Sequence, residues 1–241
     1  MLEGINSLEE LDSYENQLIN EFNSQRVLSS LNKLSDESFR QLLLQKRFHS
    51  LAFTPLYDAA IDGLSNKNAI DTCRQIVREE YPPALPSHRE DLASDLKTVG
   101  ISSKEILKSY PTSKTLDCLN QLFSILRLTA PEDFHEIKVL TLLRFWGEVL
   151  VSEEYGKFIP RLEKIGLNRQ NSAFYWPHFE HDKKKTPFYS KTAEKTHSDE
   201  LTIILQGLLD NSAKVNYASS VEKKVFELKC QFYRQFEPLL G

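Results

Sequence analysis

The residues best suited to chemistry lie in two short stretches in the last third of the chain, Tyr175 to Asp182 and Glu194 to Leu201. On a helix, His178 and Asp182 stand four residues apart and share one face. Glu194 and His197 stand three residues apart and share a face in the same way. Two imidazoles and a carboxylate are an incomplete ligand set for a redox metal such as iron. We therefore expect the missing ligands to come from earlier helices.

The composition predicts the elements that position these residues. The chain has 241 residues, of which 40% are hydrophobic and 27% are charged, and it contains only 8 glycines. Long windows rich in Leu, Glu, Lys and Gln favour helix over sheet. We expect an almost purely α protein whose residues 1–241 form a single domain around one sizeable core.

The charge pattern limits the partners that the chain can bind. The net charge is −4, and acidic and basic residues are interspersed, so no extended basic face is available to neutralise a phosphate backbone. No apolar run approaches the roughly 18 residues that cross a bilayer, and the first residues lack the layout of a signal peptide. We expect no nucleic-acid partner, no membrane partner and a cytoplasmic location.

The three cysteines do not form a recognisable site. Cys73, Cys118 and Cys230 are far apart and form no CxxC pair. This spacing argues against a disulfide framework and against a thiolate zinc site. We expect all three to be small core residues.

Capping residues and breakers predict where the helices begin and end. Ser7, Ser87 and Ser102 each precede a glutamate by three residues, as in a capping box, and Gly100 and the Pro82-Pro83 pair are expected to stop helices. The long apolar segment after Pro131 predicts one helix that bends near Gly156 or Pro160. The expected helices cover about 8–31, 35–61, 67–81, 88–100, a short turn from 103, 113–127, 132–164, a segment around His178, 193–209 and 219–236.

The order of these helices and their polar residues resembles a known family. A carboxylate pair ends the third helix, a histidine opens the fourth, a glutamate lies within the long helix, and His-x-x-x-Asp follows late in the chain. This order resembles the haem-oxygenase-like (TENA/PqqC-type) helical fold and, within it, the CADD-like non-haem iron oxidases. The resemblance runs from about Phe22 to Leu209. It includes the segments 53–55 and 158–161, which contain no expected ligand. It also includes 78–80, which contains the Glu-Glu pair.

The resemblance implies a set of metal ligands. The family binds iron through a Glu and a His from the third and fourth helices, a Glu from the long helix, and His-x-x-x-Asp-x-x-His from a late helix. Position 185, where the last histidine of that motif would fall, is Lys185, so His197 is offered in its place. The ligands implied in this sequence are Glu79, His88, Glu154, His178, Asp182 and His197.

Some assignments stay open at this stage. Glu80 is the reserve for Glu79, and Glu194 could replace Asp182 as the late carboxylate. His181 could replace His178, or it could orient a ligand from outside the metal's coordination sphere. Taken singly, each of these residues could also be an ordinary solvated or core residue. Only their combination, in the family's order, favours a metal centre.

The resemblance implies an oxidative function. Carboxylate-rich ligation lets ferrous iron reduce dioxygen, so we expect an O2-activating oxidase or oxygenase with one or two iron ions, for which manganese is an alternative. The expected partners are dioxygen and a separate small-molecule substrate. A homodimer is one oligomeric state that the sequence allows. Two other functions remain as alternatives: a non-catalytic helical scaffold of the same family, and a PqqC-like oxidase without a cofactor.

Overall fold

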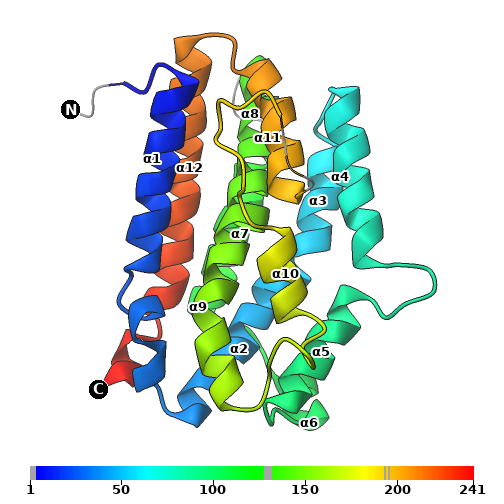
Figure 1. Cartoon of the computed structure of the whole chain (residues 1–241), viewed down its shortest axis with the longest axis vertical. Coiled ribbons are helices and arrows are strands. Elements are labelled where there is room, and N and C mark those ends of the chain that lie inside the picture. Colours follow the sequence, from blue (N-terminus) through cyan, green and yellow to red (C-terminus); the bar gives the residue numbers. More distant parts are fainter. Residues whose placement is uncertain (1–3, 128–131, 193, 195) are drawn as a thin grey trace.

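The structure, a computed structural model, describes residues 4–127, 132–192, 194 and 196–241 (Figure 1). Within these ranges the regular elements are all helices and no strand occurs, which confirms the predicted all-α class. None of the helices described combines the length and apolar character that crossing a membrane requires. The α-helices are α1 (Leu8–Asn23), α2 (Asp36–Leu51), α3 (Phe53–Ile61), α4 (Lys67–Glu80), α5 (His88–Thr98), α6 (Ser103–Lys108), α7 (Ser113–Ile125), α8 (Glu132–Leu142), α9 (Leu150–Lys164), α10 (Tyr175–His181), α11 (His197–Leu208) and α12 (Ser212–Arg234).

The bundle is organised around one long helical run, α8 and α9 joined by the π-helical segment η2 (Leu143–Val149). The first and last helices, α1 and α12, lie side by side, and α12 also packs along α8 (Figure 1). Helix α10 lies against α9, and α11 packs against η2 and α4. The C-terminal end of α4, the short helix α10 and the start of α11 therefore meet beside the middle of the long run.

Several helix ends follow the predicted capping chemistry. Ser87 and Glu90 form a complete capping box at the start of α5, and Ser102 and Glu105 form another at the start of α6. Each box satisfies backbone N–H groups that a helix start leaves without partners. Gly100 follows α5 with φ of 85°, a left-handed conformation that costs glycine little. The sequence therefore located these boundaries correctly.

The helix predicted over 35–61 is divided at Ala52 into α2 and α3. Pro55 lies in the first turn of α3 and has no N–H to donate to the carbonyl of Leu51. The lost hydrogen bond accounts for the interruption of the helix at Ala52.

The first helix ends at Asn23, well before the predicted Leu31, and a 3-10 segment, η1 (Leu28–Lys33), follows it. Polar side chains at the junction take over backbone partners that a continuing helix would use. The Ser24 hydroxyl donates to the carbonyl of Asn20, and the Gln25 amide oxygen accepts from the N–H of Val27.

The long helix differs most from its predicted form because the π segment η2 interrupts it, whereas α9 continues as α-helix through Gly156 and Pro160. Every residue of η2 is buried, including Arg144 and Glu148. A π segment is rare and often marks a functional part of a helix. Here it introduces two charged side chains into the interior of the bundle.

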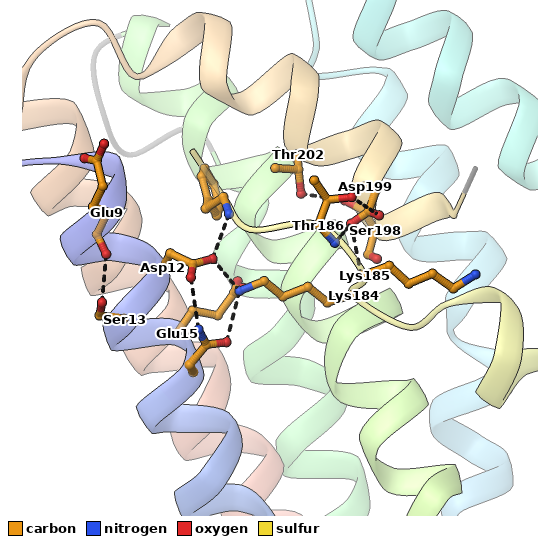
Figure 2. Close-up of polar contacts among 12 residues, drawn as sticks. Glu9, Asp12, Ser13, Glu15, Lys184, Lys185, Thr186, Ser198, Asp199 and Thr202 are labelled. Atoms are coloured by element: carbon orange, nitrogen blue, oxygen red, sulfur yellow. Dashed lines mark hydrogen bonds and ion pairs between the residues drawn. The ribbon is translucent and has the colours of Figure 1, made fainter. Parts of the chain in front are cut away.

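The buried guanidinium of Arg144 joins three helices. It is bound by both carboxylate oxygens of Glu15 from α1, with Nη2 and Oε1 3.0 Å apart, and it donates through Nε to Thr202 of α11. Lys184 adds a second cation 2.8 Å from Glu15. Figure 2 shows Lys184 reaching Asp12 and Glu15 on α1. These contacts fix the loop after α10 against the first helix.

Glu222 of α12 lies beside this ion pair in a different state. Its carboxyl lies against Glu15, with which it shares a hydrogen bond when protonated, and Oε1 is 3.8 Å from Arg144 Nη1. Burial, together with the negative charge of Glu15, raises its pKa well above the ordinary value. Burial also tends to raise the pKa of Glu15. The positive charges of Arg144 and Lys184 have the larger effect, so the pKa of Glu15 is lowered. The pair therefore carries one ionised carboxylate and one protonated carboxyl.

This difference predicts opposite results for two matched substitutions. Glu15→Gln leaves the buried charge of Arg144 without its ionised partner, and we expect it to lower the free energy of unfolding by about 3 kcal/mol at pH 7. Glu222→Gln replaces a carboxyl that is already protonated in the folded state. Because its folded pKa is raised, Glu222 costs stability as the pH rises above its ordinary value, and Gln removes that cost. Urea unfolding of the two variants measures the difference, and equal losses would contradict this assignment.

Candidate metal centre

Histidine and carboxylate side chains from five elements converge beside η2. Glu79 and Glu80 end α4, His88 begins α5, and Glu148 lies near the end of η2. His178 and His181 lie on α10 with Asp182 as its C-cap, and His197 begins α11. Three groups of these residues, two of which share His197, each offer ligand atoms within 4.8 Å of one another.

The first group, which we call the α5 trio, consists of Glu80, His88 and His178. His88 Nδ1 lies 2.8 Å from Glu80 Oε1, and the two imidazole rings lie 4.7 Å apart. Burial opposes a charge on His88, but the hydrogen bond and negative charge of Glu80 raise its pKa. His178 is partly buried, and burial together with the charge of His88 lowers its pKa to about 3. The α5 trio therefore presents one neutral imidazole, His178, beside an ion pair.

The second group, which we call the η2 trio, consists of Glu148, Asp182 and His197, all of them buried. His197 Nδ1 lies 3.5 Å from Glu148 Oε2 and 3.8 Å from Asp182 Oδ1. The hydroxyl of Tyr57 donates a hydrogen bond to the other oxygen of Glu148. Two buried carboxylates thus share one imidazole.

The third group, Glu79, His181 and His197, lies nearer the surface. His197 Nε2 is 2.8 Å from Glu79 Oε2, and the side chain of Glu79 is 41% exposed. The rings of His181 and His197 lie 4.2 Å apart. Since His197 belongs to this group and to the η2 trio, Glu79 and His181 form the outer edge of the same cluster.

The electrostatics of the η2 trio show how strongly it attracts positive charge. Burial opposes a proton on His197, but the hydrogen bond and charge of Glu148, with the charge of Asp182, raise its pKa to about 10. Burial and the negative charge of Glu148 raise the pKa of Asp182 well above its ordinary value. In the absence of a metal, the trio holds protons that offset its two carboxylates. A divalent cation would replace those protons, because metal ligands bind in their deprotonated forms.

The orientation of His178 is fixed by its own helix and by α5. The N–H at Nδ1 donates to the carbonyl of Phe174 at 2.8 Å, which leaves Nε2 as the atom with a free lone pair. The start of α10 is held by Asp95 of α5, whose carboxylate accepts from the backbone N–H groups of residues 173–175 and from the hydroxyl of Ser172. Because α5 also carries His88, the same contact fixes the two imidazoles relative to each other.

The placement of His197 depends on the loop of residues 183–192. Figure 2 shows Thr186 of this loop bonded to Asp199 at the start of α11, and Lys184 directed toward α1. Asp12 of α1 accepts from Lys184 and from the backbone N–H of Phe188, both at 2.7 Å. The Thr196 side chain caps α11. These bonds bring the residue after the cap, His197, back to the end of α10.

The structure brings together most of the residues that the sequence singled out. Among the predicted ligands, five lie in the cluster, and two of the reserves join them. The five are Glu79, His88, His178, Asp182 and His197, and the two reserves are Glu80 and His181. Glu80, rather than Glu79, makes the contact with His88. Lys185 occupies the position where the resemblance would place a histidine, and His197 of the next helix joins Asp182 in its group instead.

Two candidates lie elsewhere. Glu154 is buried one helix further along the long run, where Lys229 lies 2.7 Å and Lys46 3.2 Å from its Oε2 and the Tyr233 hydroxyl donates to its Oε1. Glu194 is exposed, and Lys185 lies 3.6 Å from its carboxylate. The position expected for Glu154 is taken by Glu148, which the sequence reasoning missed. Its only signal was a single acid within the otherwise apolar run from Phe145 to Val151.

Two cavities meet at the cluster. The first, cavity A, has a volume of about 330 Å³ and extends inward past Trp146 and Tyr155 to Lys46. The second, cavity B, has about 440 Å³ and is lined by the outer residues Glu79, His181 and His197. The residues that line both cavities are Phe53, Glu80, His88, His178 and Asp182. The cluster is therefore reachable from cavity B and forms one end of cavity A.

Two solved structures are similar to this chain. One is described as a domain of unknown function with a heme oxygenase-like fold from Shewanella denitrificans OS217, with a TM-score of 0.69 and 14% identity over 95% of this chain and 91% of that chain. The other is described as a TenA family transcription regulator from Silicibacter sp. TM1040, with a TM-score of 0.60 and 12% identity over 98% of this chain and 99% of that chain. The predicted haem-oxygenase-like fold is thereby confirmed. No protein-family profile matches the chain, and no curated protein matches it significantly.

The metal-free cluster predicts distinct titrations for two of its histidines. We expect His197 to keep its proton to about pH 10 and His178 to stay neutral down to about pH 3, as observed by long-range 1H–15N NMR of the metal-free protein. A raised pKa means that protonated His197 stabilises the fold fully below its unfolded value near 6.5, and that this contribution is lost as the pH passes about 10. Titration of either ring near pH 6.5 would show that the burial and contacts described above are incorrect.

Proposed function

We propose that this chain is a non-haem iron oxidase or oxygenase that activates dioxygen at a two-ion centre and acts on a small molecule. The observation that carries the proposal is the pair of adjacent trios, each containing histidine and carboxylate ligands, at the junction of two cavities. The α5 trio would hold one ion and the η2 trio the other. Glu79 and His181 stand at the edge of the centre, where either could complete a coordination sphere.

The donor set fits iron. Imidazole nitrogens and carboxylate oxygens suit ferrous iron and also manganese, and three protein ligands per ion leave coordination positions open. The two carboxylates of the η2 trio are matched by a single imidazole, so the trio lacks positive charge unless it binds protons or a cation. No thiolate contributes, because Cys73, Cys118 and Cys230 are buried and belong to none of the three groups.

The protein's own residues would orient the ligands and exclude water. Bound ferrous iron would supply the electrons that reduce dioxygen, which organic side chains do not provide. Tyr57 holds Glu148 through its hydroxyl, and the carbonyl of Phe174 holds His178 with Nε2 free. Phe53, Trp146 and Phe174 supply apolar walls to cavity A, where a substrate would lie beside the α5 trio.

A different activity of TENA-type proteins is not favoured by the surroundings of the cysteines. A hydrolase of that type would use a cysteine nucleophile, which must ionise to act. The pKa of the Cys73 thiol responds to Glu148 of the cluster. Burial and the negative charge of Glu148 together raise that pKa to about 12. The thiol therefore stays protonated at neutral pH, which supports the metal-dependent proposal over a thiolate mechanism.

Matched carboxylate variants test the metal centre. We expect the wild type, titrated anaerobically with ferrous iron, to bind two ions and then to consume dioxygen on exposure to air. Asp182→Ala removes a buried ligand of the η2 trio and is expected to lower the iron content to about one ion or less, with loss of most of the oxygen uptake. Glu194→Ala, a control from the same part of the chain, is expected to retain both because its side chain is 62% exposed and lies outside the trios.

Other outcomes have clear meanings for the proposal. Failure of the wild type to bind iron would favour a helical scaffold without catalytic function. Equal retention of iron by Asp182→Ala and Glu194→Ala would show that the η2 trio is not a metal site. Iron binding without oxygen uptake would separate a metal-binding protein from an oxidase.

A further inference from the structure

The inner end of cavity A contains an unusual group of cations, which we call the lysine pair. Lys46 of α2 and Lys229 of α12 both contact Oε2 of Glu154, at 3.2 and 2.7 Å. The Tyr233 hydroxyl donates to the other oxygen of Glu154 at 2.8 Å. All four side chains are buried, so two ammonium groups share one carboxylate away from bulk water.

The lysine pair carries one more positive than negative charge when both of its ammonium groups are protonated. Burial and the nearby carboxylate raise the pKa of Tyr233 well above its ordinary value, so this phenol remains neutral. Burial lowers the pKa of Lys229 to about 7, in spite of its contact with Glu154. Apart from Glu154, Lys46 contacts only the face of Tyr155, whose ring centre lies 5.0 Å from Nζ, among the described residues. Lys46 also lines cavity A, where its remaining N–H groups can meet a ligand.

His49 is a second unsatisfied group at this place. It stands one helical turn after Lys46 on α2, is only 2% exposed and lines cavity A. Neither of its ring nitrogens has a hydrogen-bond partner among the described residues. The ring lies between Phe232 and Trp146, with ring centres 4.1 and 6.1 Å away. A buried polar group without a partner costs about 1–3 kcal/mol, so a hydrogen-bond acceptor bound beside His49 would be stabilised.

Cavity A connects this polar end to the metal centre through an aromatic passage. Tyr155 lies under Lys46 on one side, and its ring centre is 6.2 Å from that of His178 on the other. Between them the walls are apolar, formed by residues such as Trp146, Val151 and Phe174. The cavity thus has a cationic end, an apolar middle and the α5 trio at its far end.

We propose that cavity A binds a small molecule with one carboxylate, which accepts hydrogen bonds from Lys46 and His49 while its hydrocarbon part extends toward the α5 trio. This inference rests on the proposed function and names the class of its substrate. A single carboxylate fits because its negative charge balances the second ammonium group of the lysine pair and favours the protonated form of Lys229. Arg89 and Asp58 also line the cavity, but both are exposed and carry opposite charges, so they add no net charge.

Paired ligands that differ only in charge test this inference. The probes are straight-chain acids from butyrate to decanoate and 3-phenylpropionate, each compared with its primary amide by calorimetry on the full chain freed of metal with a chelator. We expect the best acid to bind at least tenfold more tightly than its amide, because only the acid neutralises the lysine pair. The absence of metal ensures that a carboxylate bound directly to iron does not imitate this result.

Variants of the inner end then identify the residues responsible. Lys46→Met keeps the length of the side chain and leaves Glu154 paired with Lys229 and Tyr233, so we expect a folded protein that binds the acid at least tenfold more weakly and the amide unchanged. His49→Phe keeps the aromatic packing and removes both nitrogens, and we expect about threefold weaker binding of the acid. Lys191→Met, which changes an exposed lysine outside cavity A, is the control and should bind both probes as the wild type does.

Failure of this inference is distinguishable from failure of the proposed function. Equal binding of acids and amides, no binding of any acid, or full acid binding by both Lys46→Met and His49→Phe would overturn the carboxylate site. Iron binding with oxygen uptake could still hold in that case. Conversely, a chain that binds no iron but shows the charge preference and its loss in Lys46→Met retains the carboxylate site and loses the oxidase.

Discussion

The energetic cost of burying carboxylates governs the interior of this protein. A buried carboxylate needs a cation, a proton or several hydrogen-bond donors, because desolvation of an unpaired charge is costly. Glu15 is paired with Arg144, Glu154 with two lysines, and Asp95 with backbone N–H groups at the start of α10. Glu148 and Asp182 differ from these because His197 is the one imidazole with a raised pKa beside them. Tyr57 offers Glu148 only a neutral hydroxyl, and burial lowers the pKa of His181, which lies 3.5 Å from Asp182. The lack of positive charge at this one place distinguishes the metal centre from the structural ion pairs.

The π segment connects the structural and functional parts of the bundle. Arg144, in the first half of η2, donates to Thr202 of α11 and binds Glu15 of α1. Glu148, in its second half, faces Tyr57 of α3 and His197 of α11. Helix α11 is therefore held at two points by the same irregular segment. The stability of the bundle and the position of His197 depend on one local departure from α-helical geometry.

Local chemistry explains which features could be predicted from the sequence. Each of the capping boxes at Ser87 and Ser102 spans only four residues. The start of each helix can therefore be predicted from neighbouring residues in the sequence. The haem-oxygenase-like fold and the approach of His178 to His88 followed from the order of helices. The class of the chain and much of the cluster's membership can thus be predicted from the sequence alone.

Features that depend on contacts between residues far apart in the sequence could not be predicted from the sequence. Glu148 lies in a π segment stabilised by its surroundings, and the sequence gives no local sign of that geometry. Glu154 looks equally suitable in sequence, but Lys229, 75 residues away, determines that it forms an ion pair. The return of His197 depends on a bond between Asp12 and Phe188, which are 176 residues apart. Such long-range bonds select among carboxylates that have the same local pattern.

The central claim is that the η2 trio and the α5 trio form one metal centre, and anomalous X-ray diffraction tests it most directly. Crystals grown with ferrous iron under anaerobic conditions and measured on both sides of the iron absorption edge would locate each ion without assumptions about ligands. The account predicts two anomalous peaks, one among Glu80, His88 and His178 and the other among Glu148, Asp182 and His197. No peak at either trio, or iron bound at Glu154 instead, would contradict it.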